Sequence, residues 1–222
     1  MWPTARNPVC VPVGKHPLLT KAGLTGCVKP QRLGAMMMVA SLKDHGLTRQ
    51  TFWSHRQLRS SLLHVKVLEW PTPPCTVGDF VRFSPRMRHA GPEKWLRGKG
   101  RASTWWCAQR GHLLGVQRLV STIPDADFYL LLDADTQVFP RAMGLLLVLL
   151  EQRILQPHED LYAGHLMHPA FVSLHPDYPL KLQPFIGTGG GALLRGRTLR
   201  RLNASGTLDA FITRQTEGDY VR

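Results

Sequence analysis

The feature of this sequence that most constrains its fold is a strand–helix–strand pattern that ends at Trp70. The apolar segment AMMMVA, which begins at Ala35, is followed by polar residues and a glycine, as is typical of a buried strand that ends in a loop. Apolar residues then recur at helical spacing within residues 47–62, and HVKVLEW alternates as a strand does. Because two strands joined by a helix normally pair in parallel, the pattern predicts an α/β fold.

The rest of the chain continues this alternation of helices and strands. Residues 103–123 carry apolar side chains at helical spacing, FYLLL from Phe128 predicts a strand, and Pro140 suits the first turn of a helix. LYAGHLM, residues 161–167, predicts a short strand, and the glycine-rich residues 185–191 predict a turn that enters a strand and then a helix. We therefore expect a mostly parallel sheet flanked by helices.

The length of the chain, 222 residues, gives room for one sizeable domain. Residues 1–33 are rich in proline, glycine and lysine without a sustained period, which predicts an irregular basic arm before a single domain that covers residues 34–222. A hydrophobic share of 43% excludes a disordered chain.

The charge balance favours anionic partners, because 28 Lys and Arg residues face only 15 Asp and Glu residues. The basic residues scatter through the N-terminal third and recur in RGRTLRRL, which begins at Arg195. No helix-turn-helix, zinc-knuckle or RNP-like aromatic pattern accompanies them, so we do not expect nucleic acid as the main partner.

The cysteines and the apolar segments bear on the compartment. The four cysteines stand far apart without a CxxC pair, which argues against a zinc cage, while their even number permits disulfides in an oxidising compartment. The triplet from Asn203 to Ser205 is an N-glycosylation acceptor if the chain meets the secretory lumen. No run reaches the ~20 apolar residues of a membrane helix, and the start lacks the apolar core of a signal peptide, so these residues alone predict a cytoplasmic chain.

The stretch FYLLLDADTQVFP places Asp133 and Asp135 directly after an apolar strand. In an open parallel sheet, ligands gather at the carboxyl ends of the strands. On a turn that leaves the strand, both carboxylates can approach one cation, and Mg²⁺ and Mn²⁺ take oxygen ligands from one or two carboxylates together with substrate phosphates. The motif therefore predicts a metal-dependent nucleotide-sugar transferase, in which the metal neutralises the leaving diphosphate.

Two other interpretations of the aspartates stay open. In haloacid-dehalogenase-like phosphatases an apolar strand also precedes D-x-D, and there Asp133 would be the nucleophile and Asp135 the general acid. That pattern wants Thr or Val two residues after the second aspartate, where this chain has Gln137. The plainest alternative is a solvated turn that ends the strand.

Three later motifs follow the aspartates in order: LYAGHLMHP, FIGTGGGALLRGRTLRRL and TEGDYV. Over about residues 101–222 their order and spacing resemble the Fringe-like β-1,3-glycosyltransferases, a GT-A-fold group that includes core 1 galactosyltransferase and its relatives. AMMMVASLKDHGLTRQTFWSH resembles the first strand and helix of that family more loosely. The resemblance implies a Rossmann-like GT-A domain that transfers a sugar with inversion from a nucleotide diphospho-sugar, with UDP-sugar as the expected donor and Mn²⁺ or Mg²⁺ as cofactor.

The resemblance also implies roles for particular residues at the donor site. Asp135 would be the metal-binding carboxylate, and Asp133 would sit against the ribose or a metal-bound water as the second acid of the metal site. Gly189, Gly190 and Gly191 would let the backbone approach the donor sugar and the acceptor. His165 matches the glycine–histidine pair near the donor, and a zinc role for it is not expected because no H-E-x-x-H pattern surrounds it.

The acidic motif near the end of the chain supplies the catalytic base in this interpretation. Asp219, or failing that Glu217, would deprotonate the acceptor hydroxyl of a glycan or glycoprotein.

The chain departs from the family at several positions. Ala134 stands where many relatives have Asp, and Gly218 is an extra residue in the acidic motif. The family has a further metal-binding histidine beyond the position of Arg222 and an N-terminal membrane anchor, so we expect a truncated or diverged member. The resemblance implies the Golgi or endoplasmic reticulum, with membrane association only through a segment outside these residues. A non-catalytic relative that binds a glycan or a nucleotide is the remaining alternative.

Overall fold

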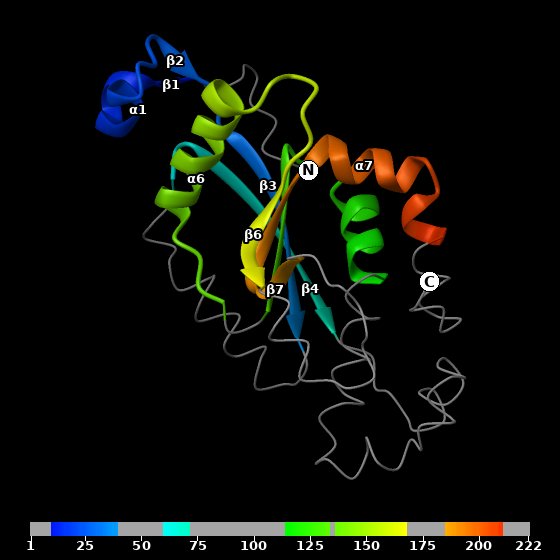
Figure 1. Cartoon of the computed structure of the whole chain (residues 1–222). Coiled ribbons are helices and arrows are strands. Elements are labelled where there is room, and N and C mark those ends of the chain that lie inside the picture. Colours follow the sequence, from blue (N-terminus) through cyan, green and yellow to red (C-terminus); the bar gives the residue numbers. More distant parts are fainter. Residues whose placement is uncertain (1–9, 40–59, 72–113, 134–135, 168–184, 211–222) are drawn as a thin grey trace, which may run out of the picture.

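The computed structural model describes residues 10–39, 60–71, 114–133, 136–167 and 185–210. Within these ranges one five-stranded sheet carries helices on both faces, which confirms the α/β class (Figure 1). Across the sheet the strands follow the order β4 (Leu63–Pro71), β3 (Gln31–Val39), β5 (Phe128–Asp133), β7 (Phe185–Arg195) and β6 (Tyr162–Met167).

The direction of the strands differs from the expectation of a mostly parallel sheet. Strand β3 pairs in parallel with β4 and with β5, as the strand–helix–strand pattern predicts. Strand β7 runs antiparallel to both β5 and β6, so the sheet is mixed. The helix expected within residues 47–62 lies almost wholly outside the described residues. Of the one expected over residues 103–123, the structure describes the part from residue 114 and shows a helix over 114–122.

Strand β5 lies at the centre of the sheet and is buried on both faces. Phe128, Leu130 and Leu132 join the apolar cluster on one face, while Tyr129 and Leu131 join the cluster on the other. The alternation follows from the two-residue period of a strand. Because helices cover both faces, both sets of positions are apolar, which is why the segment reads as a continuous apolar run.

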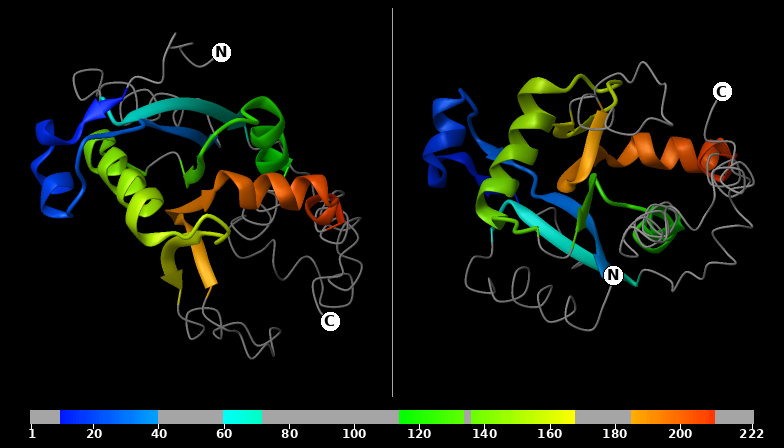
Figure 2. Two further views of the ribbon diagram at one scale, coloured as in Figure 1. Left: turned by 90° about the horizontal axis from the view of Figure 1, so that it is seen from above. Right: turned by 60° about the horizontal axis from the view of Figure 1, so that its bottom comes forward.

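Helices form a layer on each side of this sheet, as the two views of Figure 2 show. Helix α6 (Pro140–Leu149) begins with Pro140 in its first turn and continues as a π-helix, Leu150–Ile154, and it covers the face to which Leu130 belongs. The helix over residues 114–122 and α7 (Gly196–Ala204) cover the opposite face. The apolar core is thus divided into two layers by the sheet. Within the described ranges, no helix has the length and apolar character needed to span a membrane.

The N-terminal segment holds more regular structure than the expected irregular arm. Between residues 10 and 28 it forms β1 (Val11–Pro12), a 3₁₀ turn (Val13–Lys15), α1 (Pro17–Lys21) and β2 (Cys27–Val28), and β3 then starts at Gln31. Elements of two to five residues are too short to show a hydrophobic period, so their sequence resembles a loop. The division of the chain into an arm and a domain stays a prediction.

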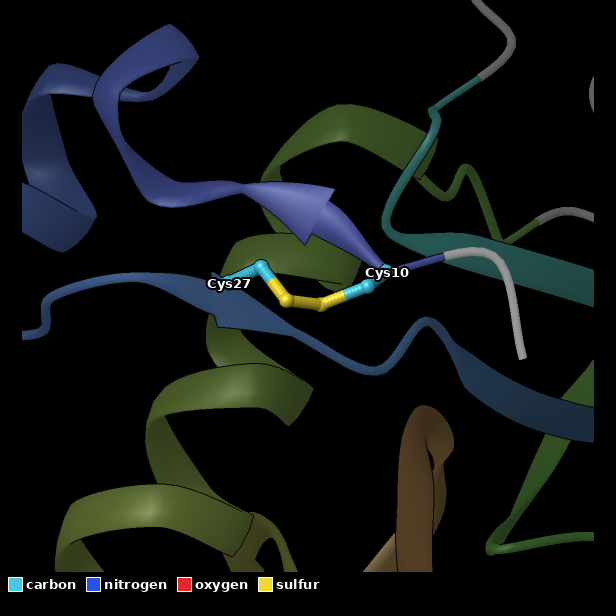
Figure 3. Close-up of a disulfide and its surroundings, with 2 residues drawn as sticks. All are labelled: Cys10 and Cys27. Carbon is cyan, nitrogen blue, oxygen red and sulfur yellow. A yellow bond between two sulfur atoms is a disulfide. The ribbon is translucent and has the colours of Figure 1, made fainter. Parts of the chain in front are cut away.

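A disulfide and an apolar cluster hold this N-terminal unit, residues 10–28, in place. Cys10, which directly precedes β1, and Cys27 of β2 form a disulfide with their Cα atoms 5.5 Å apart (Figure 3). A crosslink over a sequence separation of 17 residues adds about 3 kcal/mol in the chain-entropy account. Leu19 and neighbouring apolar side chains of the unit pack against Leu62 and against Val148 of α6. The unit is therefore fastened to the main core.

Close approach of two backbones fixes the junction between β7 and α7. The amide of Gly196 donates a hydrogen bond to the carbonyl oxygen of Asp127 at 2.7 Å. A Cβ atom on Gly196 would overlap the carbonyl oxygen of Ala126 and lie 2.9 Å from that of Asp127. Since both obstacles are backbone atoms, no side-chain rotation can make room.

We expect Gly196→Ala to lower the free energy of unfolding by about 1–3 kcal/mol, because the start of α7 and the segment before β5 must move apart to admit the methyl group. Gly14→Ala is the matched control, since a Cβ at Gly14 meets nothing within 4 Å and should change stability by less than about 0.5 kcal/mol. Urea unfolding of both variants measures the difference. Equal stability of the two variants would contradict the packing at this junction.

Candidate functional site

The order of the strands singles out the carboxyl ends of β3 and β5. From β3 the chain passes to β4 on one side, and β5 then lies on the other side of β3. This reversal is the topological switch point of an open α/β sheet, outside which ligands bind. Asp133 is the last residue of β5 and pairs with Met38 near the end of β3. The first predicted aspartate therefore occupies the position expected of a ligand site.

A break in the pairing of β6 with β7 lies beside this strand end. Gly164 of β6 pairs with Ala192, but the next residue, His165, pairs with Gly187. Residues 188–191 of β7 are therefore skipped by the register and form a bulge, which we call the glycine bulge. Such irregularities free backbone groups from the ladder and are frequent next to functional sites.

The glycine bulge corrects the expectation of a glycine-rich turn before the strand. Residues 185–191 belong to β7 itself, and the irregularity lies inside the strand. Gly191 has a φ of 91°, in the region that side chains rarely adopt, and a Cβ there would lie 3.1 Å from Cδ2 of Leu132. The backbone conformation thus favours glycine at this position, and a Cβ there would also contact the side chain of Leu132 tightly.

Three of the predicted site elements, Asp133, the glycine bulge and His165, come together at the carboxyl end of β5. Leu131 pairs with Ala192, and Gly191 approaches Leu132, so the glycine bulge runs alongside the end of β5 that carries Asp133. His165 flanks the bulge from the β6 side. Residues that are far apart in the sequence are thereby brought together at the level of the backbone.

Other predicted site residues lie outside the described residues. Asp135, Glu217 and Asp219 fall in this class, and so do the side chains of Asp133 and His165. Their roles therefore stay predictions. In the part of the chain that the structure describes, no three His, Cys, Asp or Glu side chains gather in one place. This finding does not reach the Asp133–Asp135 pair.

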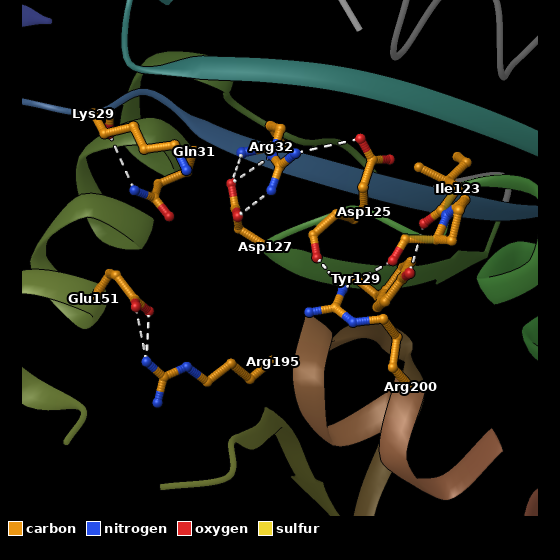
Figure 4. A network of polar contacts seen from close by, with 12 residues as sticks. Lys29, Gln31, Arg32, Ile123, Asp125, Asp127, Tyr129, Glu151, Arg195 and Arg200 are labelled. Atoms are coloured by element: carbon orange, nitrogen blue, oxygen red, sulfur yellow. Dashed lines mark hydrogen bonds and ion pairs between the residues drawn. The ribbon is translucent and has the colours of Figure 1, made fainter. Parts of the chain in front are cut away.

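The arginines of RGRTLRRL lie at the opposite, amino end of β5 and have structural partners. The side chain of Arg195 is 7% exposed, and its Nη2 donates to both carboxylate oxygens of Glu151 at 2.8 and 2.9 Å (Figure 4). Its Nη1 donates to the carbonyl oxygens of Gln156 and Glu159 at 2.7 and 2.8 Å. Arg195 thus joins the end of β7 to the π-helix and to the loop before β6.

The remaining arginines of this segment also bind loops. Nη1 of Arg200 donates to the carbonyl oxygens of Pro124 and Ala126 at 3.0 and 2.7 Å. Arg197 donates to the carbonyl oxygen of Glu159, and Arg201 pairs with Asp160. Hydrogen bonds from Thr198 and Arg201 lower the pKa of Asp160 below its usual value. The arginines of this segment therefore stabilise the fold. The net positive charge of the sequence overestimates how many basic side chains are available to bind an anion.

A second network fastens β3 to β5 at the same end. Asp127 accepts hydrogen bonds from the backbone amide of Arg32 at 2.8 Å and from its Nε and Nη2 at 3.1 and 2.9 Å (Figure 4). The hydrogen bond with Asp127 raises the pKa of Arg32. Asp125 adds a longer contact of 3.3 Å to Nη1. The sequence alone does not reveal this pair, because its partners are 95 residues apart and neither belongs to a motif.

A buried hydroxyl completes the amino end of the sheet. The hydroxyl of Tyr129 donates to the carbonyl oxygen of Ile123 at 2.6 Å inside the apolar cluster. Burial raises the pKa of Tyr129, against a smaller opposing effect of Arg200. The amino end of β5 thus holds structural contacts, whereas the backbones of the predicted site elements lie at the carboxyl end.

Comparison of the chain with protein-family models and with curated proteins finds no match. The resemblance to the Fringe-like enzymes therefore depends on the order of the motifs. The structure shows in addition that the backbones of three of these motifs lie at the carboxyl end of β5. Function has to be inferred from that edge.

We expect Glu151→Ala to lower the free energy of unfolding by about 1–3 kcal/mol, because the buried guanidinium of Arg195 loses its charged acceptor. Arg201→Ala is the control, since it removes an ion pair whose side chains are 66% and 38% exposed and should cost less than about 1 kcal/mol. Chemical denaturation monitored by circular dichroism compares the two. A larger loss in the Arg201 variant would contradict the structural role of Arg195.

Alkaline pH should destabilise the protein through Tyr129. Burial raises the pKa of Tyr129 above the ordinary value of about 10. The stabilisation that comes from burying the neutral phenol is therefore fully present below pH values of about 10, and it is lost as the pH rises through the folded-state pKa. We expect the stability of Tyr129→Phe to fall less steeply above about pH 10 than that of the wild type, after a loss of about 0.5–1.5 kcal/mol at neutral pH. Free energies of unfolding measured as a function of pH test this, and identical alkaline slopes would contradict it.

Proposed function

We propose that this protein is a metal-dependent glycosyltransferase that moves a sugar from a nucleotide diphospho-sugar to a hydroxyl group of a glycan or glycoprotein. The proposal depends on one observation. The backbones of Asp133, the glycine bulge and His165 come together at the carboxyl end of β5, next to the topological switch point. These are the positions to which the order of the motifs assigns donor binding. The proposal includes inversion at the sugar carbon and a GT-A type of fold.

The two aspartates suit a divalent cation that is shared with a diphosphate. Asp133 ends the strand at the sheet edge, and Asp135 follows two residues later in the sequence. Mg²⁺ and Mn²⁺ are usually held by one or two carboxylates, with substrate phosphates and water completing the coordination, so a third protein ligand is not required. When bound, the cation would neutralise charge on the leaving nucleotide diphosphate.

The glycine bulge would bind the donor through its backbone. Residues 188–191 have no register partners in β6, so amide groups on that side can donate to phosphate or sugar oxygens. The absence of side chains at residues 189–191 lets a ligand approach the backbone closely. Leu132 packs beside Gly191 and limits movement of the bulge toward β5.

An acid near the end of the chain would complete the chemistry. Asp219, or Glu217 in its place, would accept the proton of the attacking acceptor hydroxyl. The hydroxyl oxygen would then form the new bond to the sugar carbon as the bond to the nucleotide diphosphate breaks.

We expect the full chain to bind UDP in the presence of Mn²⁺, and Asp135→Ala to abolish that binding because a metal ligand is lost. Asp125→Ala is the matched control: it removes an aspartate at the amino end of β5, where Asp125 contacts Arg32. Isothermal titration calorimetry with and without Mn²⁺ measures both variants.

Three results would count against the proposal. The first comes from the calorimetric titrations, and the other two come from activity assays. Mn²⁺-independent binding, or equal losses in the two variants, would remove the aspartate pair from the site. Phosphate release from a model phosphomonoester that is lost in Asp133→Asn would establish a phosphatase in its place. Binding of UDP without hydrolysis or transfer of any UDP-sugar would leave a non-catalytic nucleotide-binding protein.

A further inference from the structure

The triplet Asn203–Ala204–Ser205 fits the acceptor pattern for N-linked glycosylation, and the proposed transferase activity does not use it. The other asparagine of the sequence, Asn7, is followed by Pro8 and Val9 and cannot serve in this way. Any N-linked glycan on this chain must therefore be attached to Asn203. This makes the assignment unusually simple to test.

The structure places the acceptor triplet at the end of a helix. Helix α7 ends at Ala204, Ser205 forms its C-cap, and Gly206 turns the chain with a φ of 72°. The end of α7 lies at the periphery of the described part of the molecule in both Figure 1 and Figure 2. A two-residue turn at 205–206 separates α7 from helical residues 207–210, and the exposed Ala204 and Ser205 at this turn give a modifying enzyme access to the triplet.

The local contacts leave the acceptor amide available. Asn203 is half-buried, Ala204 and Ser205 are exposed, and the side chain of Asn203 makes no hydrogen bond to other residues that the structure describes. The hydroxyl of Ser205 contacts only the carbonyl oxygen of Leu202 and the hydroxyl of Thr207 within the described part. A glycan at Asn203 would therefore displace no hydrogen bond seen there.

The disulfide supplies an independent argument for the compartment in which such modification occurs. Cys10 and Cys27 are both exposed, and their sulfur atoms are bonded to each other. In the cytosol glutathione and thioredoxin keep such accessible thiols reduced, whereas disulfides persist in the secretory pathway and outside the cell. A chain that matures with this bond has passed through an oxidising lumen.

We propose that Asn203 carries an N-linked glycan, added in the same oxidising lumen in which Cys10 and Cys27 are joined. The co-substrate is a lipid-diphosphate-linked oligosaccharide. The amide nitrogen of Asn203 forms a bond to the first sugar carbon, the bond from that carbon to the diphosphate oxygen breaks, and the amide loses one proton. This inference does not depend on the proposed transferase activity, because a protein of any function can be modified in this way.

The test uses the full chain, expressed in mammalian cells with a C-terminal epitope tag. Peptide:N-glycosidase F should increase its electrophoretic mobility, and mass spectrometry of the treated wild type should find aspartate in place of Asn203. Asn203→Gln and Ser205→Ala should abolish the mobility change, while Ser205→Thr should keep it because threonine also completes the acceptor triplet. Without prior reduction, Cys10 and Cys27 should resist alkylation.

Each contrary result would overturn the inference. Wild-type protein that is unaffected by the glycosidase would show that Asn203 is not modified. A mobility change that persists in Asn203→Gln would place the glycan elsewhere and contradict the acceptor assignment. Alkylation of both cysteines in unreduced wild-type protein would remove the argument for an oxidising lumen. Because the mass-spectrometric readout uses the wild type, poor folding of a variant cannot hide the answer.

Discussion

The burial of β5 on both faces is the constraint on which the rest of the structure depends. Its side chains fill the apolar layer beneath α6 and, alternately, the layer beneath α7 and the helix over residues 114–122. Because the strand is covered from both sides and paired along both edges, its carboxyl end is the part that leaves the core, and the chain places Asp133 there. The candidate site is thus a consequence of where the core stops.

Sequence patterns predicted those parts of the fold that have a period. Strands β3, β4 and β5 and the helix from Pro140 were each found from apolar spacing or from proline chemistry. The antiparallel direction of β7 was missed, because a strand has the same period in either direction. The short elements before residue 31 were missed because they contain too few residues to show a period.

The roles of the candidate-site residues stay predictions, and the structure describes the backbone positions of some of them. Motif order identified Asp133, His165 and the glycines, and the register of β5, β6 and β7 brings their backbones together. The glycines were assigned to a turn, since composition alone cannot distinguish a turn from a bulge inside a strand. The arginines show a second limit of prediction from the sequence. The count of charges suggested a surface that binds anions, yet the side chain of Arg195 is buried against Glu151 and two carbonyl groups. Counting charges does not reveal which of them are already neutralised.

The pairing of β3 with β5 also determines how the chain must assemble. The contact between Arg32 and Asp127 closes a loop of 95 residues, whereas the Cys10–Cys27 crosslink spans 17. The entropy of closing the larger loop has to be lost before the central strand gains any packing energy. The contacts at the centre of the sheet therefore join residues that are far apart in the sequence, whereas the disulfide of the N-terminal unit joins residues that are close in the sequence. In such topologies folding is slow, and the edge of β3 that pairs with β5 stays open to wrong partners until β5 has been synthesised and has docked.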